Sequence, residues 1–167
     1  MSFNKKKCLE LMKESKKLRQ EGKFLRDSKS EELTRYLILL DDQIFWQSCK
    51  KYCQILDLFV INKISLDEFV TQFGDLRGSN LKASRMWKEN LEEESNEIDV
   101  QLNPESCGFT KIISHLHSLI DLCDPDITLE MNFKQPELIG YGISEEFLRL
   151  RIKEDFLPRL KKYCKEF

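Results

Sequence analysis

The chain has 167 residues, of which 41% are hydrophobic and 34% are charged, and its formal net charge is −2. This length suits one domain with a buried core, and the hydrophobic fraction excludes a disordered chain. With only 6 glycines and 4 prolines, few turns are available, so long helices are favoured over a many-stranded sheet.

The charge is divided unevenly along the chain. Residues 1–29 hold 10 Lys and Arg against 4 Asp and Glu, a net charge of +6, whereas residues 30–167 hold 17 against 25, a net charge of −8. We therefore divide the chain into a basic N-terminal helical arm, 1–29, and an acidic helical domain, 30–167. Such parts can bind two kinds of partner, or they can fold onto each other.

The sequence contains neither a membrane span nor a secretory signal. No apolar run approaches the roughly 20 residues that a membrane-spanning helix needs, and residues 1–23 lack the apolar centre of a signal peptide. We expect a soluble protein of a reducing compartment, the cytoplasm or an organelle matrix such as the plastid stroma. Its six cysteines are then expected to be buried thiols. They include no Cys-x-x-Cys pair, so we expect no metal site and no cofactor.

Helical patterns begin close to the N-terminus. The first expected helix spans residues 4–21, with a narrow apolar stripe among Lys, Arg and Glu. Ser30 is expected to cap the next helix. Apolar positions then continue almost without pause over residues 33–61. This stretch fits either one long helix or two helices with a break near Asp41 and Asp42, and the sequence leaves both open.

A strong helix-start signal follows at Ser65. Ser65 and Glu68 match a capping box, in which each residue binds the backbone N–H of the other. This helix is expected to end at Gly74 or Gly78. Residues 78–106 are then expected to form an insertion or mobile loop. Their acidic run is typical of a solvated helix face, and partner binding is the alternative.

Two further helical patterns lie near the C-terminus. FTKIISHLHSLIDLCDPDI repeats apolar residues at three- and four-residue spacing before Pro125 stops the helix, and GISEEFLRLRI opens the last helix, with Ile143 able to pack against Leu148 as a hydrophobic staple. Pro158 is expected to kink or interrupt this last helix. No strand-like alternation persists anywhere in the sequence. We therefore expect an all-α protein, an antiparallel four-helix bundle with an additional N-terminal helical extension.

Residues suited to catalysis are scarce. His115 and His117, the only histidines, point in opposite directions on a helix and cannot share a metal ion. The sequence has no Gly-rich phosphate loop, HExxH, Walker-type Lys or GxSxG motif. A nucleophile pair of Cys107 or Cys123 with His115 stays open, although Cys123 lies on the apolar stripe. We expect that the protein is not an enzyme.

Two blocks of the sequence resemble a known family. YCQILDLFVINKISLDEFVTQF, and FTKIISHLHSLIDLCDPDI with GISEEFLRLRI, resemble the colicin D immunity protein-like family over about residues 52–77 and 107–164. The resemblance implies a four-helix bundle that binds and blocks a tRNA-cleaving toxin domain, with acidic side chains in place of RNA phosphates. By position, it assigns partner contact to Asp121, Asp124, Asp126, Glu145 and Glu146. The N-terminal extension and the 78–106 insertion depart from the family pattern.

A second function stays open, that of an accessory or structural subunit in a larger assembly, such as one containing RNA. The basic arm would then contact RNA or an acidic protein. The residues concerned are Lys5, Lys6, Lys7, Lys13, Lys16, Lys17 and Arg19. A Lys-rich helix often serves only to keep a protein soluble. The subunit function therefore predicts a partner whose binding requires residues 1–29.

Overall fold

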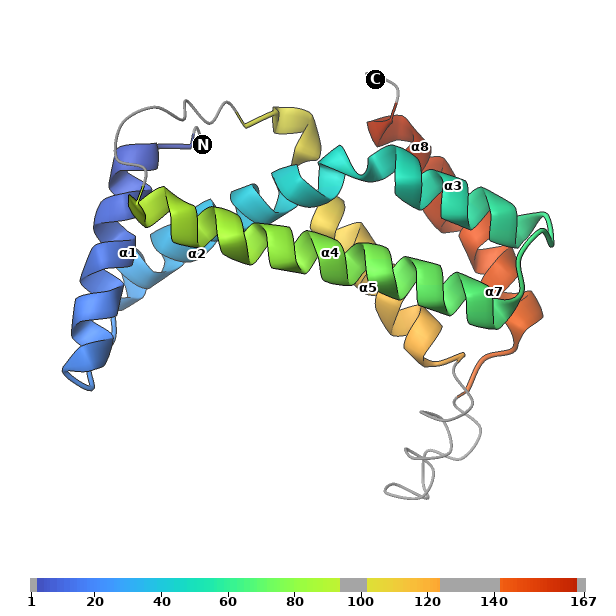
Figure 1. The fold of residues 1–167 in the computed structure, drawn as a ribbon, viewed down its shortest axis with the longest axis horizontal. Coiled ribbons are helices and arrows are strands. Elements are labelled where there is room, and N and C mark those ends of the chain that lie inside the picture. The colour runs from blue at the N-terminus through green and yellow to red at the C-terminus, as the bar shows by residue number, and fades with distance from the viewer. Residues whose placement is uncertain (1–2, 94–101, 124–141, 165–167) are drawn as a thin grey trace.

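The computed structural model describes residues 3–93, 102–123 and 142–164. Over these residues the chain forms helices and no strand, which confirms the all-α prediction. Within the same ranges, no helix is long and apolar enough to cross a membrane. Figure 1 shows one pair of helices at the N-terminal end and a larger group toward the C-terminal end.

The N-terminal pair consists of α1 (Lys5–Gln20) and α2 (Asp27–Gln47). Asn4 caps α1 by accepting a hydrogen bond from the backbone N–H of Lys7 at 3.0 Å. The extent of α1 matches the predicted helix. Because α2 begins at Asp27, the prediction that Ser30 caps it is wrong. The pair buries a small core of its own, formed by Cys8, Leu11, Leu33 and Tyr36.

The long apolar stretch is divided at Ser48, where α2 ends and α3 (Cys49–Val60) begins. Asp41 and Asp42 lie inside α2, so the break is not at that pair. The Ser48 hydroxyl donates to Asn80 Oδ1 at 2.9 Å, and Asn80 Nδ2 donates to the Tyr52 hydroxyl at 3.1 Å. A polar contact with the next helix therefore fixes the position of the break.

The next helix, α4 (Leu66–Glu93), is much longer than the sequence predicted. It passes through both Gly74 and Gly78, so the predicted end at either glycine is wrong, as is the predicted loop over residues 78–93. The helix continues because its second half is packed against α2, with Asn80 and Ser84 both buried. In Figure 1, α4 extends from the N-terminal pair to the opposite end of the molecule.

The C-terminal helices follow a short 3-10 turn, η1 (Pro104–Ser106). The sequence predicted an interruption near Pro158, and the structure has a π-helical segment just before this proline. A π-helical turn is wider than an α-helical turn, and Pro158 has no backbone N–H to donate. The segments are α5 (Phe109–Asp121), α7 (Glu145–Arg151), π-helical η3 (Ile152–Phe156) and α8 (Leu157–Tyr163).

The main core lies between the end of α2, α3, α4, α5 and the α7–α8 segment. Aromatic side chains fill it, and the rings of Phe59 and Phe69 stack with centroids 4.2 Å apart. Tyr52 is fully buried at its centre, where burial raises the pKa of the hydroxyl above its usual value. That these helices form an antiparallel four-helix bundle stays a prediction.

The cysteines differ from expectation at two positions. Cys49 at the start of α3 and Cys164 after α8 form a disulfide, with Cα atoms 5.9 Å apart. The prediction of free thiols is therefore wrong for this pair, which lies 115 residues apart in the sequence. Cys8, Cys53 and Cys123 are buried thiols as predicted, and Cys107 is exposed. The compartment stays a prediction.

Candidate protein-binding site

Three helix ends meet at the end of the molecule farthest from α1: the start of α4, the end of α5 and the start of α7 (Figure 1). The backbone N–H of Ile143 donates to the carbonyl of Leu122 at 3.1 Å, which holds the end of α5 beside the start of α7. From α7, Arg149 donates to the carbonyls of Phe59 and Ile64, at the turn between α3 and α4. These contacts place the start of α4, the end of α5 and the start of α7, each of which carries acidic residues, at the same end of the molecule.

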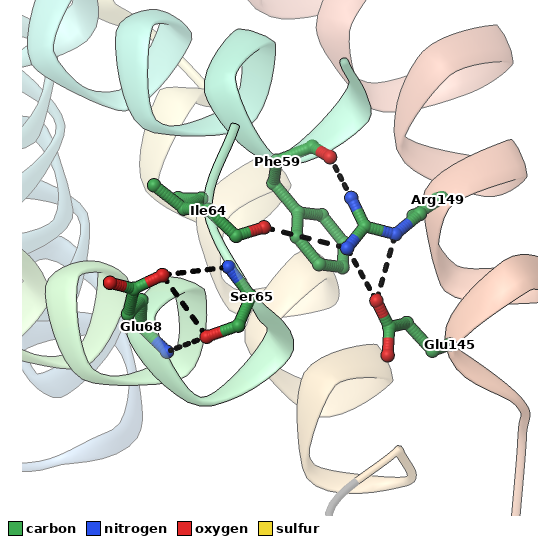
Figure 2. Close-up of polar contacts among 6 residues, drawn as sticks. All are labelled: Phe59, Ile64, Ser65, Glu68, Glu145 and Arg149. Carbon is green, nitrogen blue, oxygen red and sulfur yellow. Dashed lines mark hydrogen bonds and ion pairs between the residues drawn. The ribbon is translucent and has the colours of Figure 1, made fainter. Parts of the chain in front are cut away.

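The start of α4 is capped as the sequence predicted. The backbone N–H of Glu68 donates to Ser65 Oγ at 3.2 Å, and the backbone N–H of Ser65 donates to the Glu68 carboxylate at 2.8 Å (Figure 2). The hydrogen bonds from Ser65 hold the pKa of Glu68 below its usual value, because they favour the charged form. Glu68 and its neighbour Asp67 are both exposed, so each adds a carboxylate to this surface.

The start of α7 carries two predicted site residues with different surroundings. Ser144 caps the helix by accepting from the backbone N–H of Phe147 at 3.2 Å. Glu146 is exposed, and hydrogen bonds from its own backbone N–H and from the Ser144 side chain lower the pKa of its carboxyl. Glu145 instead accepts from Arg149 Nε at 2.9 Å. Of this pair, Glu146 is therefore the residue with a carboxylate turned to solvent.

Arg149 makes three kinds of contact at once. Its guanidinium lies 3.8 Å from the centroid of the Phe59 ring, binds two backbone carbonyls and forms an ion pair with Glu145 (Figure 2). Its side chain is only 16% exposed. The pair therefore joins α7 to the α3–α4 turn. The Glu-x-x-x-Arg spacing was visible in the sequence and is the signal that predicts this ion pair.

The remaining predicted acidic residues lie at or beyond the end of α5. Asp121 Oδ2 is 3.0 Å from His117 Nδ1, and the Asp121 side chain is 42% exposed. The His117 ring also lies 6.5 Å from that of Phe73, measured between centroids, which places this end of α5 against the first half of α4. Asp124 and Asp126 fall outside the described residues.

We call the surface formed by Asp67, Glu68, Asp121 and Glu146 the acidic end. Asp67 and Glu68 were missed as site residues because the sequence explained them fully as part of a helix start. What brings them to the site is the long-range contact of Arg149 with the α3–α4 turn, which no local pattern predicts. Exposed carboxylates at capped helix ends can pair with Lys or Arg side chains of a partner.

The predicted basic residues lie on α1, at the other end of the molecule (Figure 1). Lys5 and Lys7 are half-buried, and the exposed ones are Lys6, Lys13, Lys16, Lys17 and Arg19. Lys16 and Arg19 also line a groove of about 1050 Å³ between α1, α2 and α4. The structure therefore brings only part of the predicted basic set into a concave surface.

The opposite wall of this groove carries two cations from α4. Arg85 is exposed, and Lys88 forms an ion pair with Asp41 at 2.7 Å. Both residues fall in the segment that the sequence assigned to a loop, and so they were missed. We call the surface formed by Lys16, Arg19, Arg85 and Lys88 the basic groove. Apolar side chains of all three helices form part of its lining.

Comparisons with protein-family models, with curated proteins and with solved structures found no match to this chain. The resemblance to the colicin D immunity protein-like family therefore rests on the sequence motifs alone.

Proposed function

We propose that the protein is a non-catalytic helical domain whose acidic end docks onto a basic protein domain. In colicin D-type immunity proteins, which the sequence resembles, that partner is a tRNA-cleaving toxin domain. The observation that carries the proposal is that the starts of α4 and α7, each capped and bearing exposed carboxylates, lie at one end of the molecule with the end of α5, where Asp121 is half-exposed. Fixed carboxylates form strong charge-assisted contacts with Lys and Arg, and their field speeds encounter with a basic partner.

The structure changes the proposed division of roles among the acidic residues. Glu145 is bound by Arg149 and is assigned to holding α7 in place. Asp121 and Glu146 keep the proposed role in partner contact, and we assign the same role to Asp67 and Glu68. Phe147, next to Glu146, has 46% of its surface exposed and supplies the apolar contact that interfaces concentrate near their centre. Asp124 and Asp126 keep the assignment that the resemblance gave them.

The test begins with purification of the tagged protein from its native host at low and at high salt. A basic nuclease-like partner released by salt is the expected result. The partner is then titrated against Asp67→Asn, Asp121→Asn and Glu146→Gln. Each change is expected to weaken binding and to reduce its salt dependence, because a contact between charges is lost.

Asp75→Asn is the matched control, since this exposed carboxylate lies farther along α4 and outside the acidic end. The proposal predicts unchanged affinity for this variant. Unchanged affinity in all three variants of the acidic end would contradict it.

The basic groove favours a second candidate function, that of an accessory subunit which binds RNA or an acidic protein segment. Deleting residues 1–29 is a poor test, because removal of α1 uncovers Leu33 and Tyr36 of the small core. Lys16→Gln with Arg85→Gln removes charge from both walls while leaving the helices in place. Loss of an assembly in this variant, with retention in Lys82→Gln, would support the subunit function.

A further inference from the structure

Three sulfur atoms come together between α3 and the end of α8. Cys49 and Cys53 lie one helical turn apart on α3 and therefore face the same side of the helix. Cys164 follows α8, and its Sγ lies 3.5 Å from Sγ of Cys53. All three Sγ atoms lie within 4.8 Å of one another. Among the residues that the structure describes, no other group of His, Cys, Asp or Glu has this arrangement.

We propose that Cys49, Cys53 and Cys164, when reduced, bind one zinc ion and leave its fourth position open to solvent. Zinc binds thiolates tetrahedrally at about 2.3 Å, which places the sulfur atoms about 3.8 Å apart. The Sγ atoms of Cys53 and Cys164 lie 3.5 Å apart and all three lie within 4.8 Å of one another, so the reduced cluster is close to this spacing. The inference is independent of the proposed docking function.

The charge of the cluster favours a divalent ion. Three thiolates with Zn²⁺ carry a net charge of −1, whereas a monovalent soft ion such as Cu⁺ would leave −2, which costs more to bury. Cys49 and Cys53 are buried, and Cys164 is half-exposed. The open coordination position therefore faces the Cys164 side, where water or another small donor can reach the metal.

The surrounding contacts hold the ligands in position before metal binds. Trp46 Nε1 donates to the carbonyl of Tyr163 at 3.1 Å, and Lys161 forms an ion pair with Asp57 of α3 at 2.9 Å. These contacts fix the end of α8 against α2 and α3. Because zinc binds thiolates, the metal must displace the thiol protons, and its affinity increases with pH.

The disulfide and the metal site exclude each other. A cellular dithiol supplies two electrons and two protons, the bond between Cys49 and Cys164 breaks, and the dithiol becomes a disulfide. Zinc then forms three Zn–S bonds and releases three protons from the three thiols. Oxidation of Cys49 and Cys164 withdraws two of the three ligands and releases the ion.

The experiment uses the full chain, reduced with a phosphine under anaerobic conditions and then freed of reductant. Zn²⁺ is titrated against a chromophoric chelator, and Co²⁺ is used in parallel as a spectroscopic probe of thiolate ligation. We expect one equivalent of metal and a thiolate-to-cobalt charge-transfer band. Stoichiometric binding is expected to be lost in Cys53→Ser, in Cys164→Ser and in the oxidised protein.

Cys107→Ser and Cys123→Ser are matched controls, since both residues lie outside the cluster, and they are expected to bind one equivalent. Because Cys164 is half-exposed, Cys164→Ser without metal should melt as the reduced wild type does. Absence of metal uptake by the reduced wild type overturns the proposal. So does full uptake by Cys53→Ser and Cys164→Ser, or equal loss of uptake in the two controls.

Discussion

The carboxylate of Asp42 accepts a hydrogen bond from the backbone N–H of Thr110 at 3.0 Å, although the two residues lie on different helices. The same carboxylate accepts from the N–H of Gly108 at 2.8 Å, and Asp42 is only 2% exposed. Gly108, the N-cap residue of α5, has no side chain that can cap the helix. A residue of α2 therefore serves as the cap of α5, which joins the two helices at a buried point.

Asp42→Ala is expected to lower the free energy of unfolding by about 1–3 kcal/mol, because two partly buried N–H groups lose their acceptor. Asp42→Asn should recover part of this loss, since an amide oxygen still accepts. Urea denaturation measures both, with the exposed Asp75→Ala as the control. Equal losses in Asp42→Ala and Asp75→Ala would show that the cap adds nothing to stability.

Arg149→Leu is expected to lower the free energy of unfolding by about 1.5–3 kcal/mol, since two carbonyls and Glu145 lose a charged donor. Arg149→Lys should recover little, because an ammonium group cannot reproduce the planar set of donors. The control is Arg151→Leu, which removes an exposed ion pair with Asp155 and should change stability by about 1 kcal/mol or less. Thermal and urea unfolding that did not distinguish Arg149→Leu from Arg151→Leu would contradict this role.

The pKa of Glu68 predicts how the stability of α4 depends on pH. Its carboxyl has a lowered pKa in the folded state, so its contribution is present above the usual value of 4.5 and is lost as the pH falls through the folded-state pKa. Glu68→Gln keeps an acceptor but carries no charge. The difference in Tm between wild type and Glu68→Gln should therefore shrink as the pH falls from neutral to well below 4.5. A constant difference across this range would contradict the assignment, and Glu10→Gln on α1 is the control.

Alanine substitutions at Gly78 and at Gly22 should change the stability of the protein in opposite directions. Gly78 lies inside α4 with nothing within 4 Å of an added Cβ, so Gly78→Ala should stabilise the protein by about 0.5–1 kcal/mol. Gly22 ends α1 with φ of +70°, and Gly22→Ala should destabilise by about 1–2 kcal/mol. Differential scanning calorimetry can measure both changes. Destabilisation by Gly78→Ala would mean that α4 ends where the sequence suggested.

Features that depend on neighbours in the sequence were predicted well. The cap of Ser65 with Glu68, and the start of the last helix at residues 143–146, depend on residues a few positions apart, so the pattern contains all the partners. The apolar stripe of α5 likewise follows from helical spacing. These local signals also placed Glu146 in the first turn of a helix, where the structure shows it exposed.

Features that depend on distant partners were not predictable from such patterns. Glycine in a helix costs about 1 kcal/mol relative to alanine, and this preference indicated an end at Gly78. The burial of Asn80 and Ser84 against α2 offsets it, and neither partner is visible in a local window. The disulfide was missed for the same reason, because spacing in the sequence gives no hint that Cys49 and Cys164 meet.

The bond between Cys49 and Cys164 also gives the oxidised polypeptide an unusual covalent topology. It encloses α3, α4, α5 and α7–α8 in a ring, while α1 and α2 remain outside as a linear tail. A protease that cuts the tail releases a fragment, whereas a single cut within the ring leaves both pieces attached through sulfur. When the oxidised chain unfolds, only the tail gains the full freedom of a linear polymer, and the ring stays compact.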